Sequence, residues 1–100
     1  DFFSENTVIG CVVTNARLAK AQAAKLASVS QNGIARAVRP AHTVFDGDTV
    51  FTMCTGEVPA TPDAVGILAA HAVEQAVINA VKSADSLCGY LSYKDLRGNA

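Results

Sequence analysis

Hydrophobic and polar positions follow a strand-like and then a helix-like period in the first half of the chain. Residues 8–14 form an apolar, β-branched run, and its lack of polar alternation predicts a strand covered on both faces. From about residue 18 to residue 37, small and branched apolar side chains share one broad helical face. Arg39-Pro40 ends this pattern, because the residue before a proline disfavours the helical conformation.

The second half of the chain repeats this order. A second strand is predicted at residues 49–55, ended by Gly56 and Pro59. The clearest helix follows at residues 61–84, where Thr-Pro-Asp supplies a capping residue, a proline for the first helical position and an acid near the positive end of the dipole. Residues 85–100 are interpreted as a loop-like tail with a short turn. The predicted fold is α/β, with the local order β-α-β-α.

Composition narrows the class of protein. The 100 residues are 50% hydrophobic and 17% charged with a net charge of −1, which excludes a basic nucleic-acid footprint, an acidic tail and a disordered polymer. No apolar run approaches the ~18 uncharged residues of a membrane span, so no membrane contact is expected. An apolar excess in so short a chain predicts that a partner covers part of the surface.

The three cysteines indicate the redox state of the cellular compartment. Cys11, Cys54 and Cys88 are widely spaced, stand in apolar surroundings and form no C-x-x-C pair. They are interpreted as small buried residues of a protein in a reducing, cytoplasmic compartment.

The first candidate for chemistry is Asn6-Thr7, directly before the first strand. A threonine there is commonly only a strand former. The functional alternative is a nucleophile whose base is its own α-amino group, which requires cleavage before Thr7 because an amide nitrogen is not basic. The Thr7 hydroxyl would attack the Asn6 carbonyl and shift the acyl group from nitrogen to oxygen, and water would then hydrolyse the ester.

The second candidate is the turn Asp46-Gly47-Asp48 before the second strand. Two carboxylates this close would repel in a partly buried turn and raise at least one pKa, so the pair could hold a proton, orient a nucleophile or neutralise a lysine. The remaining spacing of a calcium loop is missing, so no metal and no cofactor are expected. His42 is interpreted as a structural residue that ties the loop by hydrogen bonds, and His71 as a packing residue of the second helix.

Together these segments resemble a known family. N-T-V-I-G-C-V-V-T-N-A, K-A-Q-A-A-K-L and G-I-A-R-A-V-R-P-A-H-T-V-F-D-G-D-T-V-F are similar to the C-terminal part of the DmpA-like peptidases. That family includes β-peptidyl aminopeptidases, the L-aminopeptidase/D-amidase and the nylon-oligomer endo-hydrolases. The resemblance covers about residues 5–84, and its most specific piece is residues 39–49.

The resemblance implies an N-terminal-nucleophile hydrolase that cuts its own precursor into a large α and a small β subunit. Thr7 would be the nucleophile and Asn6 the last residue of α, so residues 1–6 would end the large-subunit segment, 7–84 form the small-subunit core and 85–100 the tail. Asp46 and Asp48 match acidic active-site residues of the nylon hydrolases, whose Asn-Thr junction this chain shares. The implied fold is a four-layer α/β/β/α sandwich, as in the ornithine acetyltransferases.

The resemblance also implies partners. These are the large subunit from the same precursor, which holds the remaining catalytic groups, a small amide or peptide substrate, and further αβ units in a higher oligomer. Two alternatives stay open. The chain could be a non-catalytic assembly or binding fragment of this fold, or belong to an acyltransferase of the ornithine acetyltransferase type.

Overall fold

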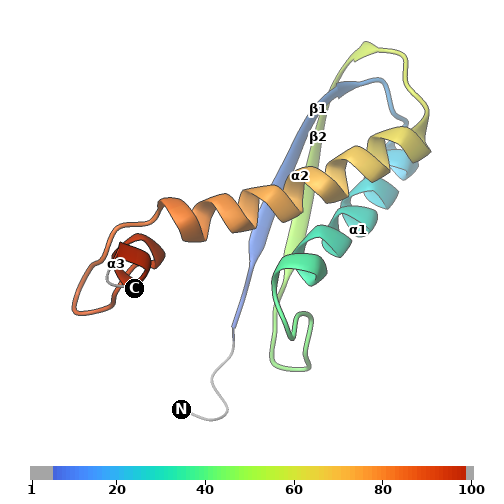
Figure 1. The fold of residues 1–100 in the computed structure, drawn as a ribbon. Coiled ribbons are helices and arrows are strands. Elements are labelled where there is room, and N and C mark those ends of the chain that lie inside the picture. Colours follow the sequence, from blue (N-terminus) through green and yellow to red (C-terminus); the bar gives the residue numbers. More distant parts are fainter. Residues whose placement is uncertain (1–5, 99–100) are drawn as a thin grey trace.

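The computed structural model describes residues 6–98, which form two strands and three helices (Figure 1). In chain order the elements are β1 (Ile9–Ala16), α1 (Lys20–Ala37), β2 (Thr49–Val58), α2 (Pro62–Ser83) and α3 (Tyr93–Gly98). The predicted β-α-β-α order is confirmed. The tail differs from its prediction, because it contains the short helix α3. Of the predicted segments 1–6 and 85–100, residues 1–5 and 99–100 lie outside the described part.

β1 and β2 form a parallel two-stranded sheet, as expected when a helix such as α1 connects consecutive strands. The register runs from Ile9 opposite Thr49 to Thr14 opposite Cys54, and it then shifts so that Ala16 lies opposite Val58. Gly56 does not end β2 as predicted. It adopts a φ of 78°, which glycine tolerates without strain, so the strand passes through an irregularity and continues to Val58.

The two long helices cross at a contact made of small residues. Gly33 of α1 is buried against α2, where an added Cβ would lie 2.3 Å from the carbonyl oxygen of Ala70. Gly66 of α2 faces α1 in turn, with an added Cβ 3.4 Å from Cγ1 of Val29. Close packing at Gly66 is therefore confirmed as the reason for a glycine inside this helix. The small size of these glycine and alanine residues lets the two helix backbones approach closely.

Only one face of the sheet is covered by the described chain. Val50 and Ala16 are buried beneath the helices, and the residues beside them point the other way. The outward set is apolar and 58–71% exposed, and consists of Ile9, Val13, Phe51 and Met53. The prediction that β1 is covered on both faces therefore holds for one face within this chain. The predicted burial of the cysteines is wrong for Cys11 and Cys88, which are exposed, while Cys54 is partly buried.

α2 reaches well beyond the sheet, and α3 lies near its far end (Figure 1). By length and composition alone α2 is apolar enough to cross a membrane, with a mean hydropathy of 1.5, although Glu74 interrupts its apolar run. Only 17% of that apolar window is buried inside the described structure. His71 is exposed on this helix rather than packed, so its interpretation as a packing residue is wrong. Much of α2 therefore presents apolar surface that this part of the chain does not cover.

Candidate active site

The fold brings the two candidate segments together at the start of the sheet. Asn6 and Asp46 form an isolated parallel bridge just before the regular pairing of β1 with β2. The Asn6 N–H donates to the carbonyl oxygen of Phe45 (3.2 Å), and the Gly47 N–H donates to the carbonyl oxygen of Asn6 (2.8 Å). Residues almost forty positions apart in the sequence, Thr7 and the Asp-Gly-Asp turn, are thereby held side by side.

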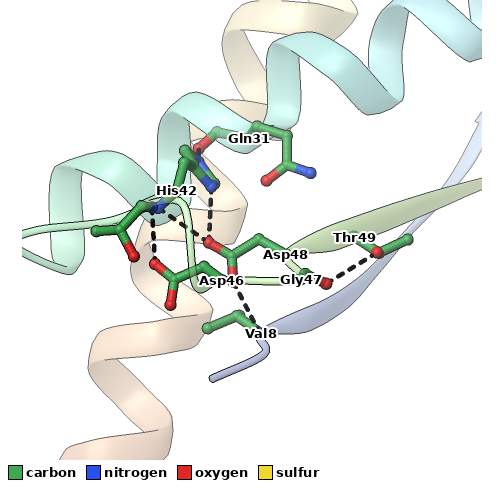
Figure 2. Close-up of polar contacts among 8 residues, drawn as sticks. Val8, Gln31, His42, Asp46, Gly47, Asp48 and Thr49 are labelled. Atoms are coloured by element: carbon green, nitrogen blue, oxygen red, sulfur yellow. Dashed lines mark hydrogen bonds and ion pairs between the residues drawn. The ribbon is translucent and has the colours of Figure 1, made fainter. Parts of the chain in front are cut away.

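Asp48 occupies the interior of this arrangement. Its side chain is 5% exposed, and both carboxylate oxygens accept hydrogen bonds (Figure 2). Oδ1 accepts from the Val8 N–H (3.0 Å), whereas Oδ2 accepts from the His42 N–H (3.2 Å) and contacts the His42 Nδ1 (2.7 Å). Burial raises the pKa of Asp48, but these donors and the charge of His42 outweigh it and hold the pKa below its ordinary value of 3.8. At this carboxylate the shift therefore runs opposite to the predicted one.

His42 joins the turn to α1. Its backbone has a φ of 56°, and its Nε2 lies 3.2 Å from the carbonyl oxygen of Gln31 (Figure 2). A carbonyl can only accept, so Nε2 carries a proton, and Nδ1 faces a carboxylate that also accepts. The ring thus links the Asp48 carboxylate in the turn to the Gln31 carbonyl in α1. The interpretation of His42 as a residue that ties the loop by hydrogen bonds is confirmed.

Asp46 is placed differently from Asp48. Its Oδ2 accepts from the Thr43 N–H (2.9 Å), while its own N–H donates to the Thr43 carbonyl oxygen (3.0 Å), so half of the carboxyl group closes the loop. Within residues 6–98, the other oxygen, Oδ1, makes no hydrogen bond, and Asp46 lines an open pocket. Of the two aspartates, Asp46 keeps an oxygen available for chemistry, and Asp48 holds the site together.

The pocket has a volume of about 380 Å³ and contains the predicted nucleophile. Thr7 is exposed there, and Gly47 lies so close that an added Cβ would be 3.1 Å from the Thr7 Oγ1. The pocket wall combines the segment just before β1, the start of the segment after α1 and the Asp-Gly-Asp turn. Its residues are Asn6, Thr7, Val8, Val38, Pro40, Ala41, Asp46 and Asp48. A larger hollow of about 430 Å³ lies between α1 and α2, away from Thr7.

The sheet pairing is opened next to Thr7. In a regular parallel ladder the Val8 N–H would donate to a backbone carbonyl, but here it donates to the Asp48 side chain. The Gly47 carbonyl oxygen instead accepts from the Thr49 hydroxyl (3.1 Å) (Figure 2). Regular pairing resumes where the Thr49 N–H donates to the Val8 carbonyl oxygen (2.9 Å). Beside the candidate nucleophile, a side-chain hydrogen bond thus takes the place of one backbone hydrogen bond of the ladder.

Comparison with known proteins shows to which family the chain belongs. The model of peptidase family S58 matches residues 3–94 of the chain. The chain belongs to peptidase family S58. An uncharacterized aminopeptidase of Mycobacterium leprae is 41% identical over 103 residues, which cover 88% of this chain and 28% of that protein. An uncharacterized aminopeptidase of Mycobacterium tuberculosis is 36% identical over 106 residues, covering 91% of this chain and 31% of that protein.

A 6-aminohexanoate-oligomer endohydrolase of Paenarthrobacter ureafaciens is 32% identical over 90 residues, covering 77% of this chain and 25% of that enzyme. S58 hydrolases act on amide and peptide bonds, and the resemblance to aminopeptidases and nylon-oligomer hydrolases is confirmed. This S58 chain spans only a quarter to a third of the length of these relatives. Its identity to the aminopeptidases exceeds that to the endohydrolase, so the comparison does not single out the nylon branch that the Asn-Thr junction favoured.

Sequence reasoning did not single out Gly47 or the Val8 N–H as parts of the site. Both contribute a backbone N–H group, and the type of a residue does not indicate where its backbone N–H group donates. The glycine between two aspartates was visible, but a turn accounts for it equally well. Its closeness to Thr7 depends on the pairing of β1 with β2, and this pairing is what the S58 chain needs to assemble the site.

Proposed function

We propose that this chain is the small-subunit region of a self-processing amide-bond hydrolase, in which Thr7 becomes an N-terminal nucleophile. The observation that carries the proposal is the placement of Thr7 in one pocket with Asp46 and Asp48, beside a hydrogen-bonded Asn6 carbonyl. Membership of a family of amide-bond hydrolases supports it. The nylon-oligomer endohydrolase relative supports the wider amidase class.

The proposed reaction has two stages. In the first, the Thr7 hydroxyl attacks the Asn6 carbonyl, and water hydrolyses the resulting ester to leave Thr7 with a free amino group. In the second, the same hydroxyl attacks a substrate amide, the amine leaves, and water releases the acyl group from the ester. The freed α-amino group or a lysine of the large subunit accepts the hydroxyl proton.

The two aspartates take different roles in this proposal. Asp48 positions the start of β1 and the turn, because its oxygens bind the Val8 and His42 N–H groups. Asp46 offers its second oxygen to the pocket and orients the hydroxyl or the freed amino group of Thr7. A carboxylate there favours the protonated form of the Thr7 α-amino group over the neutral amine. The amino group can therefore act as a base only after it has passed its proton to the large subunit.

The rest of the protein completes the proposed enzyme. The large subunit covers the outward apolar face of the sheet and much of α2, and it supplies the missing catalytic groups within a four-layer α/β/β/α sandwich. Several αβ units assemble in the cytoplasm. The bare apolar surface on β1 and β2 supports such a cover, because isolated domains rarely expose contiguous apolar patches of this kind.

The proposal is tested by mass spectrometry of the full-length protein and its Thr7→Ala and Thr7→Ser variants. The wild type is expected to yield a fragment that begins at Thr7. Thr7→Ala is expected to stay uncut and inactive, because no hydroxyl remains. Thr7→Ser keeps a hydroxyl and is expected to retain cleavage, which makes it the matched control.

Activity is measured with a panel of amino-acid p-nitroanilides and 6-aminohexanoate oligomers. Turnover of the anilides places the enzyme with the aminopeptidases, and turnover of the oligomers places it with the endo-amidases. An active wild type that is never cut, or cleavage that persists in Thr7→Ala, would contradict the proposal. A folded but uncut and inactive wild type would favour the non-catalytic assembly role.

A further inference from the structure

We infer that the backbone N–H of Gly47 stabilises the oxyanion that forms on the Asn6 carbonyl during self-cleavage. The inference also gives a role to the missing side chain of Gly47, which leaves space for the attacking Thr7 hydroxyl. It rests on the proposed function, since it concerns the first of the two stages described above. It assigns a catalytic group to a residue that has no functional side chain.

The Gly47 N–H donates its hydrogen bond to the carbonyl group of the scissile Asn6–Thr7 peptide bond. The Gly47 N–H donates to the Asn6 carbonyl oxygen at 2.8 Å, so a backbone donor already points at the oxygen on which the charge would develop. When the Thr7 Oγ1 bonds to the Asn6 carbonyl carbon, the electron pair of the C=O bond moves onto this oxygen. The donor is therefore in place before any charge develops.

The atoms of the step balance without a further reagent. The Oγ1–C bond forms, the C–N bond between Asn6 and Thr7 breaks, and the hydroxyl proton ends on the departing nitrogen. Water then adds to the ester, which restores the Thr7 hydroxyl and leaves an Asn6 carboxylate, and the proton of the new carboxyl group passes to the freed α-amino group of Thr7. Before this carboxylate forms, the former carbonyl oxygen carries a full negative charge only in the tetrahedral intermediates, where the Gly47 N–H stabilises it.

A simple ladder hydrogen bond would have the same length, so its surroundings matter. The ladder is broken at the following position, where the Asp48 carboxylate replaces a backbone carbonyl as the partner of the Val8 N–H. The Asn6 carbonyl keeps its hydrogen bond from Gly47, whereas the next backbone hydrogen bond of the ladder, at Val8, is replaced by a side chain.

Negative charge near the site would normally oppose an oxyanion. At Asp48 that charge is opposed by the backbone N–H groups of Val8 and His42, and the His42 Nδ1 lies 2.7 Å from the same carboxylate. The same contacts hold the turn that carries the Gly47 N–H.

Gly47 also sets the space around the nucleophile. An added Cβ would lie 3.1 Å from the Thr7 Oγ1, closer than ordinary van der Waals contact, and the hydroxyl would have to move. The backbone of Gly47 lies outside the left-handed region, so alanine meets no conformational barrier there. Gly47→Ala is therefore expected to keep the N–H donor and slow cleavage by crowding the hydroxyl.

The decisive experiment replaces the Gly47 amide by an ester in the full-length protein, using in vitro translation with glycolic acid at this position. Removing one oxyanion donor is expected to slow cleavage at Asn6–Thr7 by about 10²–10³-fold. The matched control is an ester at Thr49, which removes the ladder hydrogen bond to the Val8 carbonyl oxygen from the same strand pair. It is expected to cleave within about threefold of the wild type.

Equal slowing by the two esters, or wild-type cleavage with the ester at position 47, would overturn the inference. Thermal melting of both variants in a Thr7→Ala background compares their folding without cleavage. Gly47→Ala is the second variant, and wild-type cleavage in it would remove the steric part of the inference. Cleavage that persists in Thr7→Ala would instead refute the proposed function, so the two failures are distinguishable.

Discussion

Two aspartates of this chain each contact a basic side chain at the same distance, and they differ in almost everything else. Asp48 meets His42 and Asp85 meets Lys94, both with a nitrogen–oxygen distance of 2.7 Å. The Asp48 side chain is 5% exposed, whereas that of Asp85 is 87% exposed. The distance alone would rank the two pairs as equal.

The physical causes of their pKa values separate them. The pKa of Asp85 is lowered by the hydrogen bond and charge of Lys94, a partner that water and salt screen. Burial raises the pKa of Asp48, but the backbone N–H groups of Val8 and His42, together with the His42 side chain, lower it by more. A carboxylate that binds the backbone of two segments holds a fold, and one that binds a mobile lysine at the surface does not.

The same contrast extends to the regions around them. Asp48 lies beside a sheet and a close helix crossing, where Gly33 allows α1 and α2 to touch. Asp85 lies where α3 meets the end of α2 through surface contacts, such as Ser86 with Asp95 and the Lys82 ammonium 5.9 Å from the Tyr93 ring centre. We therefore expect perturbations near Asp48 to reach the candidate active site and those near Asp85 to remain local.

Among changes to these two ion pairs, the largest expected effect comes from Asp48→Asn. An asparagine side chain has one acceptor oxygen and one NH₂ group, so it can accept hydrogen bonds on one side only. Either the Val8 N–H or the His42 N–H would then lose its acceptor, and the two segments would no longer be held together. Cleavage at Asn6–Thr7 in the full-length protein is expected to slow more than tenfold, measured by mass spectrometry over time. Hydrogen exchange of residues 42–48 is expected to accelerate, while α1 and α2 stay protected. Unchanged cleavage and exchange would show that the turn holds itself without this carboxylate.

A smaller, graded effect is expected from acid. Because the pKa of Asp48 is lowered in the folded chain, its contribution to stability is fully present above the ordinary value of 3.8 and is lost as the pH falls through the lower folded value. Protection of the Val8 and His42 amides should therefore persist at pH 5 and decline below about pH 4, as followed by amide NMR. Asp48→Asn should flatten this profile. An equally steep profile in that variant would assign the acid response to another group.

The smallest effect is expected from Asp85→Asn, which removes the charge from the exposed pair. Lys94 is 50% exposed in its side chain and returns to water at little cost, so neither melting temperature nor cleavage should change beyond experimental error. The measurement is thermal melting at low and high salt beside the wild type. A clear loss of stability at low salt would make the α2–α3 junction more than a surface contact and would weaken the comparison.

Much of the local structure was predictable because it depends on neighbouring residues. The period of apolar positions located β1 and α1, and Thr61 with Pro62 placed the start of α2. The errors occurred where the outcome depended on distant residues. Gly56 was expected to end a strand, but the pairing with β1 carries β2 past it, and the tail acquires α3 through contacts with the end of α2.

The sequence by itself determined the order of elements and drew attention to Asn6, Thr7, Asp46 and Asp48. Only the tertiary structure decided how the two aspartates differ, because the Val8 N–H that binds Asp48 is 40 positions away in the chain. It also decided that the Gly47 N–H lies on the Asn6 carbonyl. Side-chain identity is written in the sequence, but hydrogen bonding by the backbone depends on which strands pair, and that pairing becomes visible only when the chain is folded.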